Sequence, residues 1–311
     1  MKIAFVFPGQ GSQQVGMGKD LCDHFEEARA VYAEANASLQ YDLRDLSFEG
    51  PKAELNRTFR TQPCLLTASI AAYRVLRSKN IVPHVVAGHS LGEYSAIVAV
   101  GVIPFRDAVV LTEKRGTFMQ EAVPEGRGLM AAIIGLERDR VDEICRSIDL
   151  GYVSPANYNC PGQIVIAGET LAVEAAMKLA KEAGARMAMA LPVSVPSHCT
   201  LMTEASNRLA TVLGPMRFES PAVPVVNNAD AMFLTSGDKI KTSLIKQLNS
   251  SLLWEDSIKN MVRNGVDTFV EVGPGRVLSG LIKRIDPAVR ILNVEDSGSL
   301  QKTLDTLATA V

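Results

Sequence analysis

The chain has 311 residues, of which 47% are hydrophobic and 21% charged, so it is neither disordered nor fibrous. Its length suits one large domain or two modest ones. The 32 basic and 34 acidic side chains nearly balance, for a net charge of −2, which excludes a general nucleic-acid binder but leaves room for a local basic patch. Because there are only four histidines, a base that works near neutral pH must be His24, His84, His89 or His198.

The five cysteines predict no metal site, because they form no CxxC pair and no Cys/His cluster with zinc spacing. We expect reduced, mostly buried thiols in a cytoplasmic protein. The longest uncharged apolar stretch, Tyr94–Phe105, is well short of the roughly 20 residues that span a bilayer. Pro8 and Gly9 interrupt the first apolar run too early for a signal peptide, so no membrane partner is expected.

Strands and helices alternate along both ends of the chain. Residues 3–7 form an apolar run of strand length ended by Pro8-Gly9-Gln10-Gly11, and apolar residues from Leu21 to Leu39 recur at the spacing of one long helix. The remaining predicted elements are helices over 63–79 and 107–121, an apolar helix that ends at Gly101, and strands over 85–87, 268–272 and 290–294. This alternation predicts a mostly parallel sheet covered by helices on both faces.

The middle of the chain follows a different order. Strands are predicted over 129–135, 152–157, 163–167 and 187–193, and helices over 137–148 and 169–183, the second with Leu171, Ala175, Leu179 and Ala183 at four-residue steps. The order β-α-β-β-α-β is that of the ferredoxin-like unit. We therefore predict a large α/β domain of residues 1–127 and 196–311, an inserted ferredoxin-like domain of residues 128–195, and a ligand cleft between them.

The segment Gly88-His89-Ser90-Leu91-Gly92 is the sharpest local signal for chemistry. This G-x-S-x-G lies where a strand turns abruptly into a helix, and its glycines allow the tight turn that lifts the serine hydroxyl clear of the sheet. The helix N-terminus favours developing negative charge, and the N–H of Leu91 is well placed as an oxyanion donor. The pattern predicts a nucleophilic serine, with a plain strand-to-helix turn as the alternative.

A nucleophilic serine needs a base, and position along the chain indicates which histidine supplies it. His89 adjoins the serine on a sharp turn, where neighbouring side chains diverge, so we expect it to support the turn by packing. His84 precedes the strand at its far end, and His24 lies among acidic residues beside a helix stripe. His198 follows Pro196 on the loop that leaves the small domain and borders the cleft, so it is the predicted general base.

Two further features bear on the class of reaction. The base lies far from the C-terminus and the expected oxyanion loop follows the first strand, which disfavours an ordinary esterase or lipase. Arg115 lies on the helix over 107–121, where it is either a solvated charge, like the neighbouring Lys114, or a cleft-facing partner for a substrate carboxylate.

Eight short segments in a fixed order resemble one protein family. They are Phe7–Ser12, Thr61–Pro63, Gly88–Glu93, Arg115-Gly116, Asn159–Gln163, Val193–His198, Gln247-Leu248 and Glu271–Gly275. Over essentially its whole length the chain resembles the malonyl-CoA:acyl-carrier-protein transacylases of bacterial type II fatty acid synthesis. That family's fold, a hydrolase-like α/β domain with a ferredoxin-like insert, agrees with the architecture predicted from periodicity.

The resemblance implies a ping-pong transfer of malonyl groups. Ser90 would attack the thioester of malonyl-CoA, with His198 as its general base, and the resulting malonyl ester would pass to the phosphopantetheine thiol of acyl carrier protein. Backbone N–H groups of Gln10 and Leu91 would form the oxyanion hole. The resemblance implies no metal and no redox cofactor, and we expect a monomer because no long apolar stripe lacks an internal partner.

The resemblance also assigns residues that bind the substrate and orient the base. Arg115 would pair with the free malonyl carboxylate, which decides between the two interpretations of that side chain. Gln62 would line the substrate cleft. The backbone carbonyl of Gln247 would orient His198 in place of a triad carboxylate.

Three segments depart from the family's pattern. Ser250-Ser251 stand where the family often has proline. Met187-Ala-Met189 follow Arg186 where basic residues are frequent, which leaves three other cations as alternative contacts for the acidic carrier protein: Arg276, Lys283 and Arg284.

The third departure concerns the donor. Ser197 precedes the base, as in polyketide acyltransferases that prefer methylmalonyl groups, although free-standing malonyl enzymes carry it too. The alternative function is therefore a free-standing acyltransferase of a polyketide pathway with a different extender unit. A non-catalytic module that binds carrier protein and a hydrolase are more distant alternatives.

Overall fold

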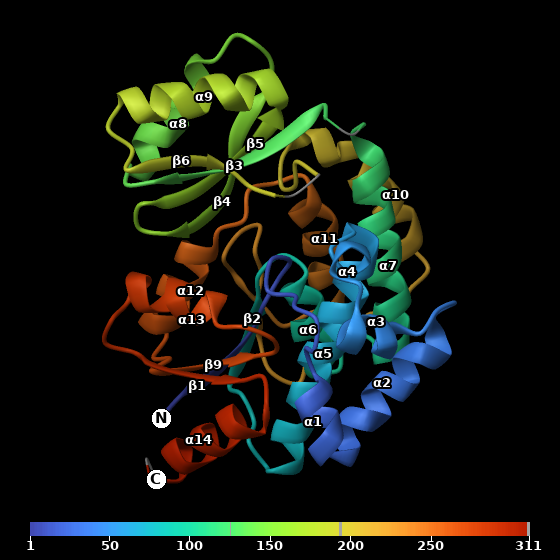
Figure 1. Ribbon diagram of the computed structural model, residues 1–311. Coiled ribbons are helices and arrows are strands. Elements are labelled where there is room, and N and C mark those ends of the chain that lie inside the picture. The colour runs from blue at the N-terminus through green and yellow to red at the C-terminus, as the bar shows by residue number, and fades with distance from the viewer. Residues whose placement is uncertain (125, 193–194, 310–311) are drawn as a thin grey trace.

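The computed structural model describes residues 1–124, 126–192 and 195–309, which form two sheets, each with its own helices (Figure 1). The larger sheet has the strand order β10-β9-β1-β2-β7-β8, and its neighbours run parallel except for β7 and β8. Its strands are β1 (Ile3–Phe7), β2 (Val85–Gly88), β7 (Val225–Val226), β8 (Phe233–Leu234), β9 (Thr268–Val272) and β10 (Arg290–Val294).

The helices of this larger lobe precede and follow the inserted segment. Those before it are α1 (Lys19–His24), α2 (Glu26–Ser38), α3 (Leu43–Glu49), α4 (Lys52–Leu55), α5 (Thr58–Ser78), α6 (Gly92–Ala99) and α7 (Phe105–Ala122). Those after it are a 3-10 turn (Thr200–Met202), α10 (Thr203–Leu213), α11 (Gly237–Leu248), α12 (Trp254–Arg263), α13 (Val277–Ile285) and α14 (Ser297–Ala308).

Alternate side chains of β1 enter two separate hydrophobic cores. Phe5 and Phe7 pack with residues of α5, α6 and α7 on one face, whereas Ala4 and Val6 pack with α12 and α13 on the other (Figure 1). Since both faces of a parallel sheet are covered, its central strand is apolar throughout rather than alternating.

The smaller lobe is an antiparallel sheet with the order β4-β5-β3-β6. Its elements are β3 (Gly128–Ile134), α8 (Arg138–Ser147), β4 (Val153–Cys160), β5 (Gln163–Glu169), α9 (Thr170–Glu182) and β6 (Met187–Ala190). Both helices pack on one face of the sheet, uppermost in Figure 1. The predicted fold class, a parallel α/β lobe with a ferredoxin-like insert, is confirmed, while Val193 of the last predicted strand lies outside the described residues.

A short segment after α11 joins the two lobes by backbone hydrogen bonds. The N–H of Leu252 donates to the carbonyl of Ala156 (2.8 Å), and the N–H of Tyr158 donates to the carbonyl of Leu252 (2.9 Å). The hydroxyl of Ser251 donates to the carbonyl of Pro155 at 2.7 Å. Ser251, one of the departures from the family pattern, therefore serves as an anchor of this segment to the small sheet.

Several predicted element boundaries are wrong, among them the end of the last strand of the small lobe, which was expected at residue 193 and lies at Ala190. The predicted helix over 21–39 is broken at Phe25, whose backbone is extended. Near this break, Arg29 Nη1 donates to the backbone carbonyl of Cys22 at 2.6 Å. Helix α5 begins at Thr58, five residues before the expected start at Pro63. Strand β4 continues to Cys160, which shortens the expected turn over 159–162.

Helix α9 buries a different face from the one that its leucines suggest. Leu171 is 70% exposed and Leu179 is 36% exposed, whereas Ala172, Ala176 and Ala180 are buried. Small alanine side chains let the helix approach the sheet closely. Because alanine is only weakly hydrophobic, the sequence pattern does not mark this face as the buried one.

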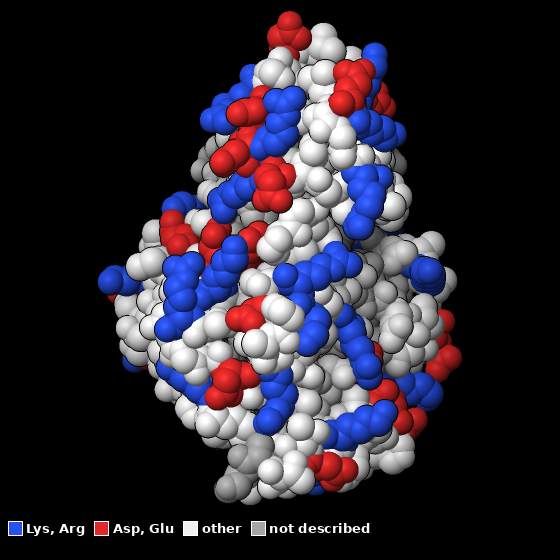
Figure 2. Space-filling model, turned by 90° about the vertical axis from the view of Figure 1, so that its left-hand side faces the viewer, with Lys and Arg blue, Asp and Glu red and all other residues white. Residues whose placement is uncertain are grey.

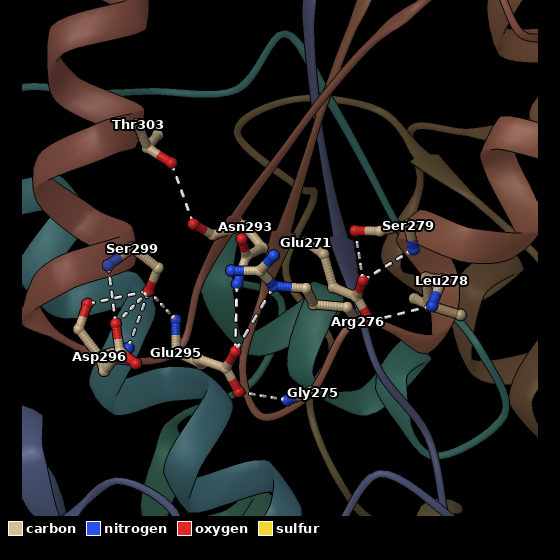
Figure 3. Close-up of polar contacts among 10 residues, drawn as sticks. All are labelled: Glu271, Gly275, Arg276, Leu278, Ser279, Asn293, Glu295, Asp296, Ser299 and Thr303. Atoms are coloured by element: carbon tan, nitrogen blue, oxygen red, sulfur yellow. Dashed lines mark hydrogen bonds and ion pairs between the residues drawn. The ribbon is translucent and has the colours of Figure 1, made fainter.

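The loop after β9 is held by two carboxylates (Figure 3). Glu271 is fully buried and accepts hydrogen bonds from the N–H groups of Leu278 (3.0 Å) and Ser279 (2.7 Å) at the start of α13. Glu295 accepts from the N–H of Gly275 at 2.8 Å. These bonds satisfy donors that a helix start and a tight turn would otherwise leave unpaired.

All five cysteines are buried and free. Among the residues that the structure describes, we find no helix that is both long and apolar enough to cross a membrane.

The packing of α9 predicts opposite outcomes for two substitutions. Ala176→Leu should lower the free energy of unfolding by about 1–3 kcal/mol, because the added methylenes enter a closed interface. Leu171→Gln should change it by less than about 0.5 kcal/mol, because that side chain is exposed. Urea unfolding of both variants measures this, and equal destabilisation would contradict the assigned face.

Candidate active site

Ser90 lies on a sharp turn between β2 and α6 with a backbone φ of 53°, in the left-handed region. The flanking glycines make this turn possible. A Cβ on Gly88 would lie 1.9 Å from the carbonyl of Gly92, and one on Gly92 would lie 2.0 Å from the carbonyl oxygen of Phe7. Strained φ values persist only where surroundings enforce them, and here they raise the serine hydroxyl above the sheet edge.

Asn228 braces this turn, and the sequence analysis missed it. Its Oδ1 accepts from the N–H of Ser90 (2.7 Å) and its Nδ2 donates to the carbonyl of Gly88 (2.7 Å). The residue is fully buried just after β7, at the same carboxyl edge as the end of β2. Its place directly after a strand was the one signal that could have pointed to it.

His198 is the histidine that contacts the serine. Its Nε2 lies 2.8 Å from Ser90 Oγ, and its Nδ1 lies 2.9 Å from the backbone oxygen of Gln247. Because a carbonyl only accepts, the Nδ1 of a neutral ring carries the proton and Nε2 is left to accept from the serine hydroxyl. Burial, and after it the nearby charge of Arg115, lowers the pKa of His198 to about 3, so the ring is neutral near pH 7.

The other three histidines lie where they do not reach Ser90 Oγ. His89 Nε2 is 2.9 Å from Asn159 Oδ1 of the small lobe, and its ring packs edge-on against Trp254. His84 Nδ1 accepts from the N–H of Ile3 at the opposite end of the sheet. His24 is exposed and contacts the carbonyl oxygen of Asp20.

Arg115 is a buried cation beside the serine, only 1% exposed. Its Nη2 donates to Ser90 Oγ (3.2 Å) and to the side-chain oxygen of Gln247 (3.0 Å), and its Nη1 donates to Gln62 Oε1 (2.8 Å). The guanidinium lies 5.3 Å from the centre of the Tyr94 ring. Within the described part of the chain, no carboxylate forms an ion pair with Arg115.

Gln62, expected to line the cleft, lies behind Arg115 instead. Its side chain is fully buried, with Oε1 on Arg115 and Nε2 donating to Met119 Sδ at 3.3 Å. It therefore holds the arginine rather than facing the pocket.

Gln10 and Leu91, whose backbone N–H groups are the predicted oxyanion donors, line the pocket next to Ser90. Among the described residues, neither of these two N–H groups has a hydrogen-bond partner. Unpaired N–H groups beside a nucleophile are the donors that an oxyanion hole requires.

The pocket around Ser90 has a volume of about 100 Å³ and draws its walls from both lobes. The large lobe supplies Ser90, Arg115 and His198, and the small lobe supplies Met130, Asn157 and Val165. A larger hollow of about 730 Å³ between α7, α10 and the loop before α7 contains none of the predicted site residues. Chemistry rather than size therefore identifies the site.

The other candidate groups lie outside this pocket. Arg276, Lys283 and Arg284 are exposed on or beside α13, and Arg284 Nη1 donates to Gln163 Oε1 across the lobes (2.7 Å). Arg186 is exposed before β6. No group of three or more His, Cys, Asp or Glu residues suited to a metal occurs in the described residues.

Comparisons with known proteins agree with this geometry. Residues 4–302 match the acyl transferase domain family. The malonyl CoA-acyl carrier protein transacylase of Escherichia coli (strain K12) is 53% identical over 286 residues, covering 91% of this chain and 93% of that protein.

Solved structures extend the likeness to the whole fold. An acyl carrier protein S-malonyltransferase from Vibrio cholerae has a TM-score of 0.95 and 49% identity, over 97% of this chain and 100% of that one. A malonyl-transacylase in complex with a type II polyketide acyl carrier protein has a TM-score of 0.96 and 47% identity, over 98% of this chain and 100% of that one. The chain therefore belongs to the acyl transferase family, among the malonyl-CoA:acyl carrier protein transacylases.

Proposed function

We propose that this enzyme transfers malonyl groups from malonyl-CoA to the phosphopantetheine thiol of acyl carrier protein, through a malonyl ester on Ser90, and so supplies fatty acid synthesis. One observation carries the choice of substrate. Arg115 places a buried guanidinium, with which no carboxylate of the described residues pairs, 3.2 Å from the nucleophilic oxygen. An acyl group that ends in a carboxylate meets this charge, and a neutral acyl group does not.

The first half-reaction acylates the serine. His198 Nε2 accepts the hydroxyl proton as Ser90 Oγ bonds to the thioester carbon, and the N–H groups of Gln10 and Leu91 stabilise the oxyanion. The carbon–sulfur bond then breaks, and the CoA thiolate takes the proton from His198. The carbonyl of Gln247 keeps the ring oriented throughout, at 2.9 Å from Nδ1.

The second half-reaction reverses these roles. His198 removes the proton of the carrier's thiol, the thiolate attacks the malonyl ester, and Ser90 leaves with the proton returned by His198. Side chains and substrates account for every proton and bond, so the proposal involves no metal and no cofactor. The small pocket limits the room for water beside the ester.

Recognition of the carrier protein would involve charged residues on the surface, outside the pocket around Ser90. Acidic and basic side chains are interspersed over the face in Figure 2, with basic ones frequent across its middle. Arg276, Lys283 and Arg284 are exposed and remain our candidate contacts for an acidic partner.

Removing the nucleophile tests the ester intermediate. Ser90→Ala should abolish the malonyl adduct that intact-protein mass spectrometry detects after incubation with malonyl-CoA. The other hydroxyls that line the pocket, those of Thr58 and Ser197, bond to Gln10 and to the carbonyl of Val195 rather than to His198. Transfer of labelled malonyl groups to carrier protein should stop as well. A persisting adduct in Ser90→Ala, or free malonate released by the wild type without acceptor at the transfer rate, would contradict the function.

Removing the cation tests donor selection. Arg115→Ala should reduce the preference for malonyl-CoA over acetyl-CoA by about 10-fold to 150-fold, since hydrogen bonds to charged groups contribute about 1.5–3 kcal/mol. The neighbouring exposed Lys114→Ala is the control and should keep the preference. Comparing kcat/KM for both donors measures this, and unchanged preference in Arg115→Ala would sink the assignment.

The lowered pKa of His198 predicts how Ser90 acylation depends on pH. A base with the ordinary histidine pKa of about 6.5 would be only about 3% neutral at pH 5, giving an about 30-fold slower reaction. With a pKa of about 3, the ring stays neutral and acylation should be nearly flat between about pH 7.5 and 5. Single-turnover acylation by acetyl-CoA avoids titration of an acyl carboxylate, and a steep decline below pH 6.5 would refute the prediction.

A further inference from the structure

Glu93 is a buried carboxylate three residues after the nucleophile that the mechanism above does not use. It lies in the first turn of α6 and is fully buried. Its Oε2 accepts from Gln247 Nε2 (2.9 Å) and from the N–H of Asn228 (3.0 Å). Burial raises the pKa of Glu93 to about 7.

The side-chain amide of Gln247 is shared between this carboxylate and the active site. Its Nε2 donates to Glu93 Oε2 and to the carbonyl of Ser90 (3.0 Å), while its Oε1 accepts from Arg115 Nη2 (3.0 Å). If the amide were rotated by half a turn, its NH₂ would face the guanidinium donors. Its oxygen would then face a carboxylate oxygen and a carbonyl oxygen, so the good contacts on both sides would be lost.

Neutral oxygens hold Arg115 in place without neutralising it. Gln62 Oε1 accepts a hydrogen bond from Arg115 Nη1, and Gln247 Oε1 accepts one from Nη2. These two bonds fix the plane of the guanidinium beside Ser90 Oγ. A carboxylate in direct contact would compete with the substrate for this charge. Glu93 contacts Gln247 and not Arg115, so its carboxylate can orient the amide and still leave the guanidinium charge available to the substrate.

We infer that Glu93 is a positioning residue for donor selection. By accepting from Gln247 Nε2 it fixes the orientation of that amide, which in turn aims Arg115 at the carboxylate of the acyl group. This inference rests on the proposed function, because it assumes that the acyl group carries a carboxylate. The competing explanation is that Glu93 acts only through its negative charge.

Two conservative substitutions separate position from charge. Glu93→Gln removes the charge but keeps an oxygen that can accept at the Oε2 position. Glu93→Asp keeps the charge but withdraws the acceptor by one methylene, too far to bond to Gln247. If position matters, the ratio of kcat/KM for malonyl-CoA to that for acetyl-CoA should fall about tenfold in Glu93→Asp, mainly through the malonyl KM. It should stay within about threefold of wild type in Glu93→Gln.

Acetyl-CoA provides the internal reference, since its acyl group has no carboxylate for Arg115. Intact acetyl turnover in Glu93→Asp would show that Ser90 and His198 remain in place. A general structural defect would instead lower acetyl turnover as well. Glu271 offers a matched control, because it is another fully buried carboxylate that accepts backbone N–H groups, at the start of α13. Glu271→Asp and Glu271→Gln should leave the malonyl-to-acetyl ratio unchanged.

Any other pattern overturns the inference. Examples are a malonyl-to-acetyl ratio that falls in Glu93→Gln but not in Glu93→Asp, and a ratio that stays at the wild-type value in both variants. Should Glu93→Asp fail to fold, Gln247→Leu replaces it, because this variant keeps the backbone carbonyl that orients His198. Gln247→Leu should then lower the ratio, and an unchanged ratio would overturn the inference. The wild-type ratio tests the proposed function separately: a wild type without malonyl preference refutes that function, whatever the variants do.

Discussion

The site depends on burying one positive charge that has no ionic partner among the described residues. Placing a guanidinium in the interior costs several kcal/mol unless hydrogen bonds compensate it. Arg115 donates to the side-chain oxygens of Gln62 and Gln247 and to the hydroxyl oxygen of Ser90, but no carboxylate among the described residues pairs with it. The fold thus stabilises the cation enough to keep it in place and leaves its charge for a ligand. The same charge helps to keep His198 neutral, so the selectivity group and the base are electrostatically coupled.

The two lobes contribute differently to this arrangement. The large lobe holds Ser90, His198 and Arg115, and the small lobe contributes Met130, Asn157 and Val165 to the wall of the pocket. The segment after α11 links both tasks. Gln247 orients the base at the end of that helix, and Leu252 a few residues later pairs with the small sheet. The position of the base is therefore connected to the seam between the lobes.

Much of this arrangement was predictable from local pattern. The strand–turn–helix around Ser90 pointed to it as the candidate nucleophile, and the scarcity of histidines left His198 as the candidate base; the two side chains are in contact. The predictions failed where the signal was not local. The buried face of α9 is made of alanines, whose small side chains carry little hydropathy signal, and the break at Phe25 lies within an otherwise unbroken helical spacing. The partners of Ser90 in Asn228 and Gln247 are more than a hundred residues away in the chain.

The sequence by itself determined four strands of the large sheet, the elements of the small lobe and the candidate reacting groups, because periodicity, turn residues and rare residue types are local features. It did not indicate the helices α10 to α14 or the strands β7 and β8. Tertiary structure decided which atoms face each other. Only folding shows that Gln62 lies behind Arg115 rather than in the cleft, and that Glu93 bonds to the far side of the Gln247 amide. The physical reason is that a hydrogen bond depends on distances of about 3 Å and on direction, and these are set by the packing of elements that the chain order leaves far apart.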